Sequence, residues 1–145
     1  MNKFLNLENL TDKKLDMKTV SPLTFAFIGD GVYELLVREY IVNMGNCPVK
    51  KLNNAKVELV KCEFQAEICK NLLEDMFTEK EKEIYLRGRN AHVGHVPKNS
   101  NVSDYHTATA FEAVFGYLYL SGEIERLKYL FSELVRYIES IKVIY

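Results

Sequence analysis

Apolar residues recur every three or four positions along most of this sequence, which is the spacing of α-helices that face a common core. Only three prolines and seven glycines are spread over the 145 residues, so long stretches contain nothing that interrupts a helix. A chain of this length builds one hydrophobic core rather than two. The pattern therefore predicts an all-α protein with a single domain over residues 1–145, with its core at about 20–140.

Ser21 followed by Pro22 predicts a helix start, because serine caps free backbone amides and proline fits the first helical turn. That helix is expected to run to about Asn43, since Gly45 and a nearby proline interrupt the pattern. A second helical stretch, either straight or bent, is predicted over about 49–75.

Thr78 and Glu81 have the spacing of a capping box, in which each side chain satisfies the backbone amide of the other residue. We expect a helix from there to about Arg87, with the alternating charges of 79–83 as a solvated face. The stretch 87–104 combines glycines, a proline and small polar residues, and it is predicted to be a long loop. Loops of this length usually have a function or are disordered.

Two more helices complete the pattern. Ser103 is expected to cap a helix that ends near Gly122, because serine is a good cap and glycine a common helix end. A last amphipathic helix is predicted from about Glu123 to Ser140.

Asp30 places a carboxylate between two glycines in an apolar run, "FAFIGDGVYE" at 25–34. An ionised carboxylate among apolar neighbours is costly unless it has a partner. Three outcomes are open: neutralisation by an arginine or lysine, a raised pKa, or service as a metal ligand. Gly29 and Gly31 each cost a helix about 1 kcal/mol relative to alanine, so they indicate close approach of another backbone or of a ligand.

Glu112 repeats this anomaly in a second apolar stretch, "ATAFEAVFGYLYL", with Gly116 one turn later. Two helices can pack closely at such glycines, and Asp30 and Glu112 would then share one cleft of low dielectric constant. Two carboxylates together favour a hard cation such as magnesium, which takes oxygen ligands and keeps several waters. Glu34, one turn beyond Asp30, has two open interpretations: a further ligand, or an ion pair with Arg38 at i+4.

Charge and the length of apolar runs narrow the class of protein. The formal net charge is -1 at neutral pH, so charge alone does not predict a nucleic-acid partner. No apolar run has the length of a signal peptide or a membrane span, which predicts a cytoplasmic protein with no membrane partner. The three cysteines, Cys47, Cys62 and Cys69, lack the paired spacing of a zinc site and are expected to be reduced thiols in or near the core.

These stretches resemble a known family. "FIGDGVYE" and, much later, "TAFEAVFGYLYL" resemble the two signature helices of the ribonuclease III catalytic domain, and "RGRNA" with "PKN" resemble Mini-ribonuclease III in particular. The motifs occur in order from about Pro22 to Leu120, which makes the resemblance specific. It implies the ribonuclease III endonuclease-domain helical fold, a homodimer, and a magnesium-dependent endoribonuclease that hydrolyses double-stranded RNA. It further implies processing of both ends of precursor large-subunit (23S) ribosomal RNA.

The resemblance assigns Asp30 and Glu112 as the catalytic and metal-binding residues, which hold magnesium so that it activates a water against the phosphodiester. In the larger enzymes of the family, further acids stand at the positions of Leu23, Ala26 and Thr109. Two carboxylates with waters and substrate phosphate can hold one magnesium ion. Whether a second ion binds is left open.

Cations cluster in the loop stretch, where Arg87, Arg89 and Lys98 stand in a chain of almost zero net charge. Such groups grip phosphates without reading bases, which suits an A-form duplex. Asn90 and Asn99 are expected to add hydrogen bonds to the RNA. A solvated loop with incidental charges is the alternative. With no chain left for a separate RNA-binding domain, we expect binding to come from the helical domain itself.

The implied homodimer makes chemical sense, because one site per protomer cuts one strand of a duplex each. Several aromatic residues on the two signature stretches are candidates for the core or for a dimer contact, with the core favoured for each individually. They are Phe25, Phe27, Phe111, Phe115, Tyr117 and Tyr119.

A function of another class also stays open: a non-catalytic double-stranded RNA-binding or interaction module of the same fold. The loss of the two outer acids of the first signature stretch favours it. The retained Asp30 and Glu112 oppose it, because a site without turnover has no reason to keep two costly carboxylates. The histidines of "HVGH", His92 and His95, lack a third ligand nearby and are not expected to hold a metal.

Overall fold

The computed structural model describes residues 13–141, and every regular element in that range is a helix. The all-α prediction is therefore confirmed. In chain order the elements are the short 3-10 helix η2 (Met17–Thr19), α1 (Pro22–Met44), α2 (Val49–Val60), α3 (Cys62–Asn71), the 3-10 helix η3 (Leu73–Asp75), α4 (Glu79–Arg89), α5 (Val102–Leu120) and α6 (Ile124–Ile141).

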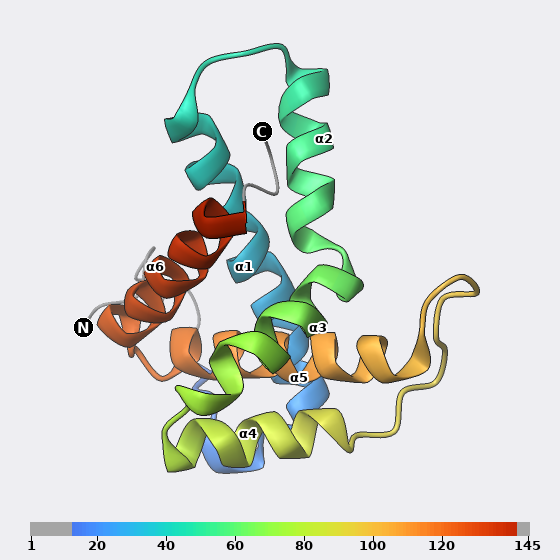
Figure 1. Ribbon diagram of the computed structural model, residues 1–145. Helices are drawn as coiled ribbons and strands as arrows, with labels where there is room; N and C mark the ends of the chain where they lie inside the picture. The colour runs from blue at the N-terminus through green and yellow to red at the C-terminus, as the bar shows by residue number, and fades with distance from the viewer. Residues whose placement is uncertain (1–12, 142–145) are drawn as a thin grey trace.

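Helix α5 is the centre of the arrangement and packs against α1, α3, α4 and α6. Figure 1 shows α1 crossing behind α5, with α4 running alongside α5 on its lower side. The C-terminal half of α1 and α2 stand together as an arm above this crossing. The segment between α4 and α5 projects away from the helices at the right-hand edge of this view.

The hydrophobic core lies where α1 meets α5, and aromatic rings fill it. Tyr33 of α1 is fully buried and meets Phe111 and Phe115 of α5 edge-on, with ring centroids 4.9 and 5.7 Å apart. Such edge-to-face pairs stabilise a core beyond the area that they bury. Helix α6 adds a row of buried aliphatic side chains: Ile124, Leu127, Leu130, Leu134 and Ile138.

Local capping bonds begin two of the helices as predicted. The Thr24 N–H donates to Ser21 Oγ at 3.2 Å at the start of α1. At the start of α4, the Glu81 N–H donates to Thr78 Oγ1 at 3.2 Å, and the Thr78 N–H donates to Glu81 Oε1 at 3.0 Å. The capping box is therefore confirmed.

Three boundaries differ from the prediction. Helix α4 continues to Arg89, so Arg87 and Arg89 lie on its last turn and not in the loop predicted over 87–104. Helix α5 is capped by Asn101 and not by Ser103, because Asn101 Oδ1 accepts from the Asp104 N–H at 3.0 Å and the helix begins at Val102. The stretch predicted over 49–75 is broken at Lys61, whose ψ of 149° is extended and cannot continue a helix.

The prediction that 79–83 forms a solvated face is wrong for Glu81. Its side chain is 3% exposed and accepts from Arg126 of α6 through Nε at 2.8 Å and Nη2 at 2.9 Å. Arg126 Nη2 also donates to the Met76 carbonyl at 2.8 Å. A two-pronged arginine partner offsets the cost of burying the carboxylate, and the pair ties α6 to the start of α4.

The three cysteines are free thiols, with Cys69 buried and Cys47 and Cys62 half-buried. Across residues 13–141, none of the helices combines the length and the apolar character needed to cross a membrane.

Candidate active site

The crossing of α1 and α5 is built on two glycines. A Cβ atom at Gly29 would overlap the backbone carbonyl of Glu112, and a Cβ atom at Gly116 would overlap that of Phe25. Only residues without a side chain let two backbones approach this closely. The predicted close packing of the two signature stretches is present, and it explains both glycines.

Gly31 needs another explanation. No atom lies within 4 Å of a Cβ atom built at this position, so helix packing does not require a glycine there. Gly31 is exposed and follows Asp30 directly. The surface beside Asp30 is therefore open.

Asp30 and Glu112 come together at this crossing, as the two glycines led us to expect. Burial raises the pKa of Glu112 to about 8, and the negative charge of Asp30 and a hydrogen bond with it are the next causes. A hydrogen bond from Gln65 acts in the opposite direction. One of the two carboxyls thus has the raised pKa expected for a pair of acids that share one place.

The apolar surroundings expected for Asp30 are not found. Asp30 is exposed, and its neighbours Phe27 and Leu35 are 84% and 49% exposed. The face of α1 that carries these residues points away from the core, whereas Val32 and Tyr33 point into it. The cost of desolvation therefore falls on Glu112, and the preference for a core position is wrong for Phe27.

Gln65 belongs to the site and was not predicted. Its side chain is 2% exposed, and Nε2 donates to the Val60 carbonyl at 2.9 Å and to Glu112 Oε2 at 3.5 Å. A signal for it exists in the sequence: Gln65 precedes Ile68 and Leu72 by three and seven positions, which is the register of the apolar face.

Neither Glu34 nor Thr109 adds a metal ligand to this pair. Glu34 is paired with Arg38, with Oε2 2.7 Å from Nη2 and 2.9 Å from Nε, so the ion-pair interpretation is the one observed. Thr109 Oγ1 donates to the Tyr105 carbonyl at 3.0 Å within its own helix. In the described part of the chain, no three His, Cys, Asp or Glu side chains form a group that could hold a metal ion.

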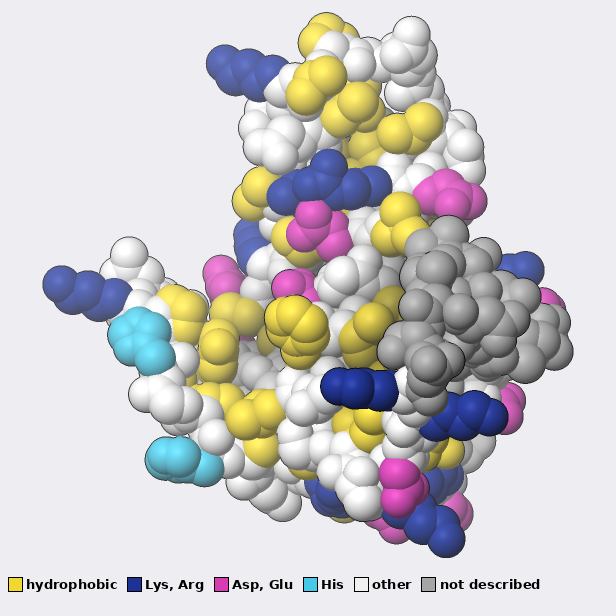
Figure 2. Space-filling model, turned by 180° about the vertical axis from the view of Figure 1, so that it is seen from behind, with side chains coloured by type: hydrophobic (Ala, Val, Ile, Leu, Met, Phe, Trp, Pro, Cys, Tyr) yellow, Lys and Arg dark blue, Asp and Glu magenta, His cyan; other side chains and the backbone are white. Residues whose placement is uncertain are grey.

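The predicted RNA-binding residues lie together at one end of the α4–α5 pair. Arg87 and Arg89 are exposed on the last turn of α4, and Asn90 caps that helix. Lys98 and Asn99 are exposed in the projecting segment between α4 and α5 (Figure 1). Figure 2 shows cationic and histidine side chains on this projection and hydrophobic side chains across the face beside it.

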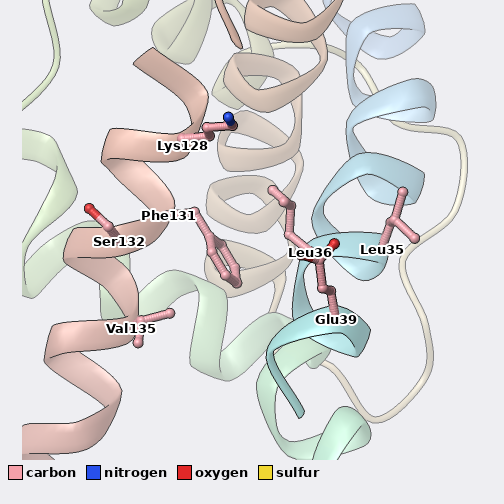
Figure 3. Close-up of a pocket in the computed structure, with 7 residues that line it drawn as sticks. All are labelled: Leu35, Leu36, Glu39, Lys128, Phe131, Ser132 and Val135. Carbon is pink, nitrogen blue, oxygen red and sulfur yellow. The ribbon is translucent and has the colours of Figure 1, made fainter. Parts of the chain in front are cut away.

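An apolar pocket of about 690 Å³ lies between α1 and α6, away from the paired carboxylates. Figure 3 shows Leu36 and Phe131 projecting toward one another across it. Neither Asp30 nor Glu112 lines this pocket, so its size carries no information on catalysis. The remaining lining residues are Leu35, Glu39, Lys128, Ser132 and Val135.

Comparisons with known proteins find relatives along most of the chain. The Ribonuclease III domain family matches residues 23–123. Mini-ribonuclease 3 from a Thermoanaerobacter strain is 46% identical over 134 residues, which cover 92% of each chain. Mini-ribonuclease 3 from Clostridium tetani is 39% identical over 130 residues, 88% of this chain and 83% of its own. A crystal structure of a Fusobacterium nucleatum protein matches with a TM-score of 0.76 and 30% identity, covering 85% of this chain and 99% of that one.

Proposed function

The chain belongs to the ribonuclease III family of endoribonucleases, and we propose that it hydrolyses double-stranded RNA at the pair formed by Asp30 and Glu112. The convergence of these two carboxylates at the crossing of α1 and α5 carries the proposal. Because Gly29 and Gly116 hold the crossing through backbone contacts, the acids stand on rigid helices. A catalytic pair needs rigid elements of this kind to fix the distance between its two side chains.

Enzymes of the ribonuclease III family in general require a divalent metal ion. We propose that Asp30 and Glu112 hold magnesium, a cation that takes oxygen ligands. The pair fits such an ion, because burial and the charge of Asp30 together raise the pKa of Glu112 to about 8, and a cation offsets both effects. Water and RNA phosphate complete the ligand set.

When bound, the cation supplies a water of lowered pKa and electrostatic stabilisation of the phosphate. Asp30 from α1 and Glu112 from α5 would hold it at the helix crossing. Glu112 must give up its proton to act as a ligand, so cation binding and ionisation of this carboxyl are coupled. Asp30 is exposed, so the RNA backbone can reach this side of the pair.

We propose that the end of α4 and the projecting segment grip the RNA backbone. Within residues 13–141, no salt bridge ties Arg87, Arg89 or Lys98 to a carboxylate, so all three cations are available for phosphates. Asn90 and Asn99, both exposed, add hydrogen bonds to phosphate or 2′-hydroxyl oxygens. Contacts of this kind recognise the shape of a duplex rather than its sequence.

We propose that a second copy of the chain packs on the exposed face of α1. Leu23, Phe27 and Leu35 are 39%, 84% and 49% exposed and follow one another at multiples of four residues, with Gly31 in the same row. Figure 2 shows hydrophobic side chains spread over this side of the molecule. An apolar row of this length is typical of a protein interface. A homodimer places one site opposite each strand of the RNA.

The narrower proposal for the substrate is the duplex stems of precursor 23S ribosomal RNA, processed in the cytoplasm. Similarity to Mini-ribonuclease 3 proteins over about nine-tenths of the chain supports it. A non-catalytic module is the less favoured function, because both carboxylates are present and lie together.

The test is to incubate the purified protein with a long RNA duplex, with and without magnesium, and to map cuts in both strands. We expect cuts in both strands only when magnesium is present, and none in single-stranded RNA of the same sequence. The Asp30→Asn protein is the matched control. A protein that binds the duplex but leaves it intact at every magnesium concentration would be a binding module instead.

A further inference from the structure

The break between α2 and α3 lies against the proposed active site. Because α2 ends at Val60, its last carbonyls have no partner in the helix and need one elsewhere. The Leu59 carbonyl accepts from the Tyr33 hydroxyl at 2.6 Å, and the Val60 carbonyl accepts from Gln65 Nε2 at 2.9 Å. Side chains from α1 and α3 therefore hold this break in place.

Gln65 also reaches α5, because the same Nε2 donates to Glu112 Oε2 at 3.5 Å. A side-chain amide has two N–H donors, and here they meet a carbonyl and a carboxylate. If the amide were turned over, its oxygen would face the Val60 carbonyl oxygen, which is always an acceptor, and repel it. The orientation of Gln65 is therefore fixed by its neighbours.

Packing alone does not account for a glutamine here. The Oε1 atom is buried and has no hydrogen-bond partner within residues 13–141. An unpaired buried oxygen is costly, so an apolar side chain would fill the space better if packing were the whole requirement. What the amide adds at this position is its N–H donors, and one of their two acceptors is Glu112.

Resting on the proposed function, we propose that Gln65 is a positioning residue for the cation site: it ties the Glu112 carboxylate to the end of α2 and holds it in the orientation that receives magnesium. It does not touch the reacting atoms itself. Groups that orient metal ligands in this way typically change metal affinity by about 10- to 100-fold when they are removed.

Gln65→Met tests the proposal, because methionine has similar length and no N–H donor. We expect the magnesium concentration for half-maximal cleavage to rise on the order of tenfold, while the KM for duplex RNA stays unchanged. Without RNA, the rise in melting temperature that magnesium gives should be smaller than in the parent. Gln65→Asn, which keeps the donors on a shorter side chain, should change both quantities in the same direction and serves if the methionine variant does not fold.

Tyr33→Phe is the matched control, because it removes the other side-chain bond at the same break, to the Leu59 carbonyl, and no hydrogen bond to Glu112. It should lower the metal-free melting temperature and leave the magnesium requirement within about twofold of the parent. If Gln65→Met behaves like Tyr33→Phe, Gln65 is structural only and the inference is overturned.

The two proposals fail in different ways. A parent protein that never cuts duplex RNA overturns the proposed function, whatever Gln65 does. A parent that cuts in magnesium, together with a folded Gln65→Met protein of unchanged magnesium requirement, overturns only the role of Gln65. The melting temperatures measured with magnesium and without RNA test the Gln65–Glu112 contact independently of RNA cleavage.

Discussion

Gly29 of α1 lies against the backbone carbonyl of Glu112 in α5, so closely that a Cβ atom at position 29 would overlap that oxygen. The residue that precedes Asp30 therefore touches the backbone of Glu112, the other proposed catalytic residue. Gly116 repeats the contact in reverse against Phe25. The separation of Asp30 and Glu112 is thus set by backbone contact between two helices, and a change at this contact should alter stability and catalysis together.

Gly29→Ala should destabilise the protein strongly. Overpacking of a core costs typically about 1–3 kcal/mol, and the obstacle here is backbone, which cannot move aside as a flexible side chain can. Denaturant unfolding would measure the loss in the free energy of unfolding. Cleavage at saturating magnesium should fall as well, because the carboxylates move apart.

Gly31→Ala is the control for this change. Nothing lies within 4 Å of a Cβ atom at Gly31, and alanine favours a helix by about 1 kcal/mol over glycine. Its stability should equal or exceed that of the parent. Equal stability of the two alanine variants would mean that the helices do not touch at Gly29.

The helices that could be predicted are those whose limits depend on residues close in sequence. Thr78 and Glu81 cap α4 across three positions, and both bonds form. The choice between Asn101 and Ser103 as the cap of α5 could not be predicted, because both are good caps and the decision depends on where the projecting segment rejoins the core. The break at Lys61 has no proline or glycine to mark it, and it is stabilised by contacts with α1 and α5.

For the candidate site, the two acids could be predicted from the sequence, but their burial could not. Asp30 and Glu112 are conspicuous because each interrupts an apolar run beside a glycine. The apolar runs predicted a cleft of low dielectric constant for both acids, but Asp30 is exposed and Glu112 is half-buried. The burial of each acid depends on the face that its helix turns to the core. The pair Glu81–Arg126 joins segments distant in sequence, so the charge pattern of 79–83 alone could not show it.

Asp30→Asn should fold and bind duplex RNA but cut it at least about a hundredfold more slowly, a loss of about 2.7 kcal/mol in transition-state stabilisation. The amide keeps the size of the side chain and removes the charge that holds the cation. Single-turnover cleavage at saturating magnesium and a separate binding titration measure the two effects. Undiminished cleavage would remove Asp30 from the site.

Glu112→Gln should change how metal-free stability depends on pH. Because the pKa of Glu112 is raised from 4.5 to about 8 in the folded protein, the folded state keeps a proton that the unfolded state releases between these values. Stability from this group is therefore present below about pH 4.5 and falls as the pH rises to about 8. The variant lacks this component. The free energy of unfolding of the variant minus that of the parent should therefore grow between about pH 4.5 and about pH 8 and then level off. A difference that does not vary with pH would contradict the raised pKa.

Magnesium should stabilise the parent more than it stabilises the Glu112→Gln variant. At neutral pH without metal, Glu112→Gln should be as stable as the parent or more stable, because the variant does not have to take up a proton on folding as Glu112 does. Added magnesium should raise the melting temperature of the parent and hardly that of the variant, since binding to the folded state is what stabilises it. Equal gains in the two proteins would show that Glu112 is not a ligand.

Replacing Arg87, Arg89 and Lys98 together by alanine should weaken binding to unrelated duplexes alike. Each lost phosphate contact removes released counterions, so the slope of log affinity against log salt should flatten by about 1 per contact. A control with Lys18, Lys128 and Arg136 changed to alanine removes the same charge from exposed positions elsewhere. If both triple variants have the parent slope, the projecting segment and the end of α4 do not touch phosphate.

Phe27→Asp should convert a dimer into monomers. Phe27 is 84% exposed at the middle of the apolar row on α1, and a charge there would have to be buried without a partner in the interface. Sedimentation equilibrium would give a mass near that of two chains for the parent and of one chain for the variant. Val49→Asp is the matched control, because Val49 is 78% exposed on α2, away from the row, and its change should leave the dimer intact. In the proposed dimer each protomer supplies one site, so the Phe27→Asp protein should also lose paired cuts in the two strands of a duplex at concentrations where the parent makes them. A Phe27→Asp protein that still sediments as a dimer would place the interface on another face.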